Sequence, residues 1–216
     1  MSAMESGFPV ADDYKCRFSF QDGWVDLTLE GRTRAEAMGL AGAVMRHFNP
    51  VELSVDSRKL FDDLVDRAMD LNGDEPIMAA AYYTPGGIAL ADLMVDSYGE
   101  DGVPRPSPEE VTPLLLDWSN ATIAGEPEVT NFDHPAGPAV RVHAMVSTKR
   151  LLGFGRQLGE FVKYAVFPPG FTSLVVVTVS WQRIHEHDDL TQITDDLVAG
   201  MQVVPVDADG NEIEPG

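Results

Sequence analysis

The sequence predicts an α+β fold in which one antiparallel β-sheet packs with helices in a single domain. Turns rich in glycine and proline separate pairs of apolar stretches, which is typical of hairpins and therefore of antiparallel strands. Helical spacing of apolar residues occurs near the start, in the middle and at the end of the chain, rather than between every pair of strands. The 216 residues, 44% of them hydrophobic, are enough to build one sizeable core.

The first predicted element is an N-terminal hairpin. Residues 17–20 and 24–29 flank the turn Gln21-Asp22-Gly23, and Asp-Gly between apolar stretches favours a tight turn. From Val25 to Leu29 apolar and polar residues alternate, so one face of this strand should be buried and the other exposed.

Two helices are expected next. The first opens at Thr33 and Glu36, which have the spacing of a capping box, and it stops before Pro50. The second opens near Ser57 and stops at Asn72, which a glycine follows. Both stretches place apolar residues at helical spacing, so each should cover the sheet with one face.

The middle of the chain predicts a second hairpin and a third helix. Residues 77–84 and 88–97 flank a Pro-Gly-Gly turn. The sequence SPEE at 107–110 provides an N-cap, a proline at the first helical position and acids in the first turn. This helix should run to about Trp118, and Pro113 makes it either kink or restart.

The last third is the richest in strands. Residues 128–132 and 139–148 flank one turn that contains proline and glycine, and residues 160–167 and 172–182 flank another. A final helix over about 189–201 has apolar residues on one face. The chain then continues into a short strand or extended segment.

Domain boundaries and location follow from the two ends of the sequence. We expect an N-terminal lead over 1–14, one domain over 15–205 and an acidic tail over 206–216. The first residues lack a basic stretch followed by an apolar one, so no signal peptide is indicated and a cytoplasmic location is expected. Cys16 is the only cysteine, which excludes an intramolecular disulfide and a cysteine-based zinc site.

The charge of the chain limits its partners. Asp and Glu number 35 against 15 Lys and Arg, a formal net charge of −20. Such a surface repels nucleic-acid phosphates and anionic lipids, so we expect no nucleic-acid binding. The longest apolar stretches are too short to span a bilayer, so we expect no membrane insertion. Two interpretations of the acidity stay open, namely solubility alone and a basic protein partner.

The stretch WQRIHEHDDL, at 181–190, raises the question of a metal or acid–base site. Two of its residues, His185 and His187, are candidate metal ligands. Asp188 and Asp189 are also good N-caps for the final helix, which favours a strand-to-helix connection without a metal. No other histidine is fixed near His185 by the pattern, so we expect no metal and no cofactor, with His185 and His187 as the alternative metal ligands. The remaining histidines are His47, His134 and His143.

The segment around GFGRQLG, at 153–159, does not have the spacing of a phosphate-binding loop. It does combine apolar and basic residues. Either its apolar residues are tucked into the core, or the segment forms an apolar lip that binds a partner. The candidate partner-binding residues are Leu151, Leu152, Phe154, Arg156 and Leu158.

The order of these segments resembles a known superfamily. An N-terminal FSFQDGWVDLTL is followed by a helix, then by EVTNFDHPAGPAVRVHAMV, EFVKYAVFPPGFTSLVVVTVSW and the closing helix DLTQITDDLVAGMQVV. This pattern, over most of residues 15–205, resembles the PsbP-like α/β/α sandwich superfamily, with its Ran-binding Mog-type, DcrB-like and effector-chaperone members. The resemblance implies an α/β/α sandwich and a non-enzymatic protein that binds other proteins. It supplies no catalytic residues.

Two hypotheses about function follow. The first is an intracellular adaptor or chaperone-like protein that binds a protein partner through a sheet face or through residues 149–160. The second is an enzyme, or a small-ligand or metal-binding protein, with a pocket between helices and sheet that uses His143, His185 or nearby acids. The sequence has no Gly-x-Ser-x-Gly motif, and no pair of carboxylates stands out among its many acids. We favour the first hypothesis.

Overall fold

The computed structural model describes residues 13–99, 105–118, 121–149, 156–182, 187–207, 209 and 211–213, and the structural statements below concern this part of the chain. The helices are α1 (Arg34–Val44), α2 (Ser57–Leu71), α3 (Pro108–Leu116) and α4 (His187–Ala199). The strands are β1 (Asp13–Arg17), β2 (Trp24–Asp26), β3 (Met78–Tyr83), β4 (Ala89–Tyr98), β5 (Ala121–His134), β6 (Gly137–Lys149), β7 (Arg156–Val166), β8 (Leu174–Trp181) and β9 (Gln202–Val206).

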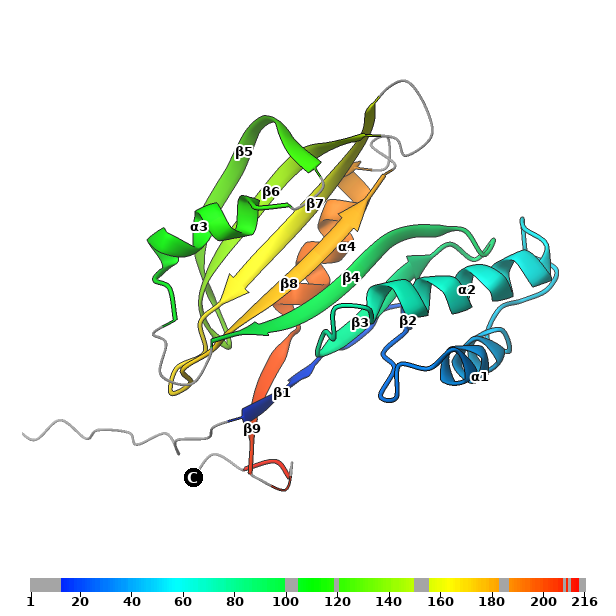
Figure 1. The fold of residues 1–216 in the computed structure, drawn as a ribbon, viewed down its shortest axis with the longest axis horizontal. Coiled ribbons are helices and arrows are strands. Elements are labelled where there is room, and N and C mark those ends of the chain that lie inside the picture. Colours follow the sequence, from blue (N-terminus) through cyan, green and yellow to red (C-terminus); the bar gives the residue numbers. More distant parts are fainter. Residues whose placement is uncertain are drawn as a thin grey trace, which may run out of the picture.

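Seven strands form one twisted antiparallel sheet in the order β2-β3-β4-β8-β7-β6-β5 (Figure 1). The predicted α+β, sheet-dominated single domain is therefore confirmed. β2 and β5 are the two edge strands of this sheet. The short β2 lies at the edge next to α1 and α2, and the long β5 lies at the opposite edge.

The two faces of the sheet carry different helices. On one face, Leu190 and Leu197 of α4 belong to the same apolar cluster as Val175 and Val177 of β8. On the other face, α3 covers β5, β6 and β7. α1 and α2 cover β3 on that same face. Figure 1 shows α2 and α3 in front of the sheet and α4 behind it.

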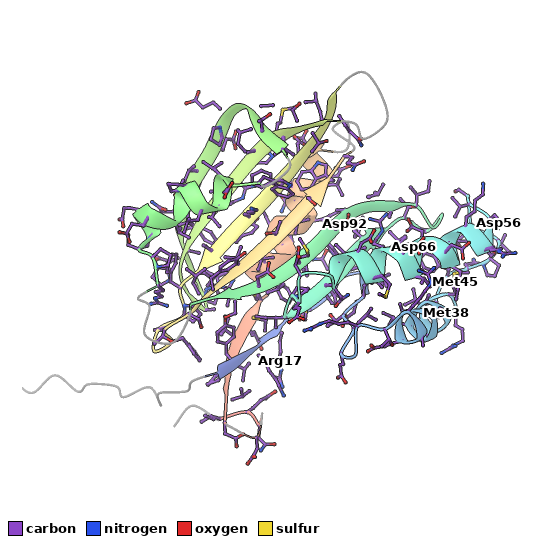
Figure 2. All side chains as sticks on the ribbon, viewed as in Figure 1. Arg17, Met38, Met45, Asp56, Asp66 and Asp92 are labelled. Atoms are coloured by element: carbon purple, nitrogen blue, oxygen red, sulfur yellow. The ribbon has the colours of Figure 1, made fainter. Side chains whose placement is uncertain are left out.

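A polar strip separates the two apolar clusters under α2 and α3. It runs across the centre of the sheet, where β4, β8 and β7 contribute Asp92, Asp96, Thr178, Ser180 and Lys163 to the same face. Figure 2 shows Asp92 on β4 next to α2, and Arg67 of α2 bridges it by an ion pair. The sheet between α2 and α3 is therefore polar and partly buried, whereas the flanking parts are apolar.

The predicted N-terminal hairpin is wrong. β1 pairs with β9, in the register Cys16↔Val203, and β2 pairs with β3 instead. The expected turn does exist, since the Trp24 amide donates to the Gln21 carbonyl, but it connects two different sheets. The pairing follows from burial, because Tyr14 and Cys16 are buried in the cluster around α4 and β8, which holds β1 against the last strand.

The local helix and turn signals were more accurate. The Thr33 hydroxyl accepts from the Glu36 amide, as a capping box requires, although the Glu36 carboxylate binds the amides of Glu30 and Gly31 instead of closing the box. The capping box of α3 is complete, and the helix continues through Pro113. The β3–β4 hairpin is confirmed.

Several predicted boundaries differ from the structure. α1 ends at Val44, so Phe48 lies beyond it. β1 begins at Asp13, inside the stretch expected to be a lead. β5 spans 14 residues, far more than expected, because the bulge between Ala124 and Glu128 joins two shorter stretches. None of the described helices combines the length and the hydropathy needed to cross a bilayer.

Candidate functional site

A groove lies between the C-terminal half of α1 and the edge of the sheet at β2. Its volume is about 750 Å³, which is within the range of small-ligand sites. We call it the α1–β2 groove, and its lining consists of residues 22–26, residues 40, 43 and 44, residues 47–49, residue 52 and residues 82–85. Its walls are thus an edge strand on one side and a helix on the other.

The strand wall is formed by a turn that only glycine fits well. Gly23 has φ +98°, and a Cβ there would approach the Tyr82 ring to 2.5 Å. Trp24 lies directly opposite Tyr82 on β3, with ring centroids 5.4 Å apart. The Trp24 indole is buried, and no described residue accepts a hydrogen bond from its Nε1. The Asp22-Gly23 turn therefore leads the chain into β2 at the edge of the sheet, and the turn itself does not cover the outer side of that strand.

The backbone of β2 uses only one of its two sides. The Tyr83 amide donates to the Gly23 carbonyl at 2.7 Å, and the Leu27 amide donates to the Ala79 carbonyl at 2.8 Å. Hydrogen bonding alternates along an antiparallel strand, so Gly23, Val25 and Leu27 face β3. The Asp26 N–H and C=O therefore point to the outer side of the sheet, where no described strand pairs with β2.

The helix wall is set by the packing of α1. Ala37 and Ala41 are fully buried, which lets α1 lie close to α2. Leu40 and Val44 are only partly buried and line the groove. Beyond the helix end, Phe48 packs edge-on against the Tyr83 ring at 6.0 Å. The floor of the groove is apolar for this reason.

The rim of the groove is acidic. Asp22, Asp26 and Glu52 are exposed there. Two of these carboxylates are fixed by local hydrogen bonds, Asp26 by the Thr28 amide at 2.9 Å and Glu52 by the Asn49 side chain at 2.8 Å. The described lining of the groove includes no lysine or arginine. The site therefore combines an apolar floor with a negative rim.

Asn72 fixes the chain that leads from β2 to α1. It is buried at the C-terminal end of α2 and donates from Nδ2 to the carbonyls of Leu27 and Ala68, at 2.9 and 2.7 Å. Its Oδ1 accepts from the Leu29 amide at 3.0 Å. This one side chain holds the chain after β2 against α2. The sequence indicated Asn72 only as a helix stop.

A second hollow, of about 370 Å³, lies at the polar strip between α2 and the ends of β6, β7 and β8. Arg67 is its central cation and bonds both Asp63 and Asp92. The Tyr83 hydroxyl donates to Asp63 at 2.6 Å. Burial raises the pKa of Asp92, and the neighbouring Arg67 opposes that rise. Both carboxylates neutralise Arg67, so among the described residues that line this hollow no cation is left unpaired.

The predicted partner-binding residues lie largely outside the described part of the chain. This applies to Leu151, Leu152 and Phe154. Arg156 and Leu158 are not in a loop, because β7 begins at Arg156 and pairs with β6 up to Lys149. Leu158 is 42% exposed and lines the hollow at the polar strip.

The histidines do not converge in the described structure. His185 lies outside the described residues, and His187 opens α4 rather than belonging to the connection before it. β8 ends at Trp181, so the strand does not reach either residue. Among the described residues, no group of three or more His, Cys, Asp or Glu side chains is placed to hold a metal ion.

The other histidines have structural surroundings. His134 is buried at the end of β5, where its Nε2 is 2.8 Å from the Val198 carbonyl of α4. His143 points to the α4 face of β6, away from the buried row around Val142. Its Nδ1 is 3.7 Å from a Glu128 carboxylate oxygen, and its ring stacks beside Trp181 at 6.4 Å.

Comparison with known proteins adds no family to this picture, because neither a scan against family models nor a search of curated proteins found a match. The groove was missed from the sequence because its residues have other obvious roles. Asp22 and Gly23 indicated a hairpin turn, and Leu40, Val44 and Phe48 indicated a helix core face. The signal that the sequence did contain was the series of apolar positions on α1, because the short length of β2 was not predicted.

Proposed function

We propose that the protein is a non-enzymatic, cytoplasmic adaptor or chaperone-like protein that binds a protein partner in the α1–β2 groove. The observation that carries this proposal is the combination of an apolar floor and a strand edge in one hollow. Protein partners commonly use such grooves, because the floor takes side chains while the edge takes main-chain hydrogen bonds. We include in the proposal that the fold is an α/β/α sandwich of the superfamily it resembles.

Exposed apolar side chains also occur on α1 and on its connection to α2, outside the lining of the groove. Met38, on the exposed side of α1, is 50% exposed, and Val51, in the connection to α2, is 91% exposed. Figure 2 shows Met38 on α1 and Met45 directly after the end of that helix. Neither Met38 nor Val51 lines the groove, so they add exposed apolar surface to this end of the molecule without extending the hollow itself.

Site-specific photo-crosslinking in the producing cell tests the proposal. A photoreactive phenylalanine analogue replaces His47, which is exposed and lines the groove. A second variant carries the analogue at position 158, because Leu158 is an exposed residue within the alternative surface around residues 149–160. The matched control carries it at Glu109, which is exposed on α3 far along the sheet from β2.

The three positions separate the outcomes. A discrete crosslinked protein from position 47, absent from position 109, is the expected result. A product from position 158 alone would place the interface near the start of β7 and contradict binding in the groove.

The alternative surface around residues 149–160 can be tested by a substitution variant. Deleting residues 151–158 is unsuitable, because residues 156–158 pair with β6 and their loss would damage the sheet. Replacing residues 151–154 with Gly and Ser avoids this.

A small-molecule site is the second candidate, and the volume of the groove favours it. About 750 Å³ would accommodate a drug-sized apolar ligand. Native mass spectrometry of the purified protein distinguishes the two functions. A stoichiometric small molecule that is lost on substituting a groove residue, together with no crosslinked protein, would replace the adaptor proposal.

A further inference from the structure

We propose that the α1–β2 groove binds an extended partner segment that pairs antiparallel with β2 and alternates apolar with basic side chains. This inference rests on the proposed function and names the class of its partner. Three features of the groove lead to it: the outward main-chain groups of β2, the alternation of its side chains between two surroundings, and the charge of its rim.

The main chain of β2 favours a strand as the occupant. Asp26 presents both its N–H and its C=O to the outer side of the sheet, since Gly23 and Leu27 on either side bond to β3. In an antiparallel pair, one residue of the incoming strand satisfies both groups at once. A helix has no main-chain groups available along its length to do this. Every pair already in this sheet is antiparallel as well.

The alternation of β2 sets the side-chain pattern of the partner. Val25 points to the α1 face, where it joins the apolar cluster with Leu40 and Val44. Trp24 and Asp26 point to the other face. Directly opposed residues of an antiparallel pair share a face, so the partner residue bonded to Asp26 lies beside its carboxylate. Its two neighbours point toward α1 and the apolar floor.

The negative charge of the rim determines which charge the partner segment should carry. Asp26 lies beside the paired position, and Asp22 and Glu52 lie along the same groove. Asp26 and Glu52 are held by hydrogen bonds to neighbouring residues, so little further ordering is needed to bind a cation. The net charge of −20 also disfavours an acidic partner. Lysine or arginine therefore fits beside Asp26, and apolar residues fit toward α1.

Synthetic peptides of about seven residues, the length of an ordinary strand, test the mode of binding. One peptide alternates valine with lysine, and a second has glutamate in place of lysine. Two further versions of the first carry N-methyl groups on either all lysines or all valines. Binding to the full chain is followed by NMR, with the Asp26 amide as the reporter.

The N-methyl pair is the sharpest comparison. In the proposed pairing the lysine N–H groups face β2 and the valine N–H groups face away. Methylation of the lysines should therefore abolish binding, whereas methylation of the valines should leave it. The unmethylated lysine peptide should shift the Asp26 amide, and the glutamate peptide should not bind. Reversed sensitivity to the two methylations, or equal binding by the glutamate peptide, would overturn the inference.

Charge neutralisation provides the second arm. The double variant Asp22→Asn and Asp26→Asn removes two rim charges while keeping the turn and the acceptor for the Thr28 amide. Losing two exposed ion pairs should weaken binding of the lysine peptide about two- to thirtyfold. The control, Asp62→Asn with Glu109→Gln, removes two exposed charges from α2 and α3 and should leave the affinity unchanged. Equal weakening in both double variants would overturn the role of the rim.

The peptide and crosslinking results together distinguish failure of this inference from failure of the proposed adaptor function. If a protein crosslinks from position 47 but the lysine peptide does not bind at up to about 1 mM, the groove binds a partner of another kind and only the present inference fails. If neither result is obtained, both proposals fail together.

Discussion

Asn72 should be one of the most sensitive positions for stability, because its side chain replaces a strand pairing that the chain lacks. After β2, the chain is still bonded to β3 by the Leu27 amide and the Thr28 hydroxyl, and it then leaves the sheet toward α1. Asn72 bonds the carbonyl of Leu27 and the amide of Leu29, and both of these residues are buried, at 0% and 3% exposure. Asn72→Ala removes all of these hydrogen bonds at once.

The magnitude follows from the groups that lose their partners. A buried main-chain group left without a hydrogen bond costs about 1–3 kcal/mol. Asn72→Ala leaves two such groups, on Leu27 and Leu29, and also deprives the Ala68 carbonyl near the helix end of a second donor. We therefore expect a loss of about 2–5 kcal/mol in the free energy of unfolding. Typical surface substitutions change stability by less than about 0.5 kcal/mol.

Urea unfolding, followed by tryptophan fluorescence, measures this loss. The matched control is Asn131→Ala, which removes the same side chain from an exposed position on β5. The midpoint should fall clearly for Asn72→Ala at unchanged slope and stay within error for Asn131→Ala. A loss below about 1 kcal/mol for Asn72→Ala would refute the reasoning, since it would mean that the segment after β2 holds its position without this side chain.

Three further predictions concern other parts of the fold. Burial raises the pKa of the Cys16 thiol to about 12, so a thiol reagent at pH 8 should modify Cys16 only after the protein is unfolded, and rapid labelling of the native protein would contradict its placement in the core. Burial, with the nearby Asp74 carboxylate, also raises the pKa of Asp96; the native state then holds this proton more tightly, so stability falls as pH rises through the raised pKa. Asp96→Asn should therefore raise the unfolding midpoint at pH 7, with the gain disappearing below the ordinary carboxyl pKa of about 3.9, and a gain that persists there would point to another cause. Tyr14→Phe removes the hydroxyl that donates to Ser97 at 2.8 Å, so it should lower the free energy of unfolding by about 1 kcal/mol and speed hydrogen exchange in β1 before the main sheet; uniform acceleration in both would show that the β1–β9 ribbon does not open separately.

Local signals allowed much of the fold to be predicted. The caps of α1 and α3 and the β3–β4 hairpin are each encoded within a few residues, and each is present. The pairing of β1 with β9 could not be found in this way. It joins residues 13–17 to residues 202–206, and only the burial of Tyr14 and Cys16 against the core determines it. The first strand was expected at 17–20 and overlaps β1 only at Arg17, so the sequence indicated neither the bounds of β1 nor its partner.

The candidate site was less predictable than the fold. Each of its residues has an ordinary local explanation, since Gly23 makes a turn and Leu40 lies on an apolar helix face. The groove exists because β2 is only three residues long and α1 packs mainly on α2 rather than over the edge. That is a property of the tertiary arrangement. The five candidate partner-binding residues were chosen from composition alone, and of these the structure describes the strand pairing of Arg156 and the side-chain surroundings of Leu158.

The most direct test of the account is partner retention by a protein whose groove is filled. Ala43→Trp places a large side chain in the groove, and Leu114→Trp is the control, because Leu114 is 61% exposed on α3 outside the groove. Tagged proteins are purified at native expression level, and the proteins that copurify are quantified by mass spectrometry. We expect a stoichiometric partner with the unsubstituted protein and with Leu114→Trp, and its loss with Ala43→Trp. Retention of the same partner by a correctly folded Ala43→Trp protein would contradict the claim that the α1–β2 groove is the binding site.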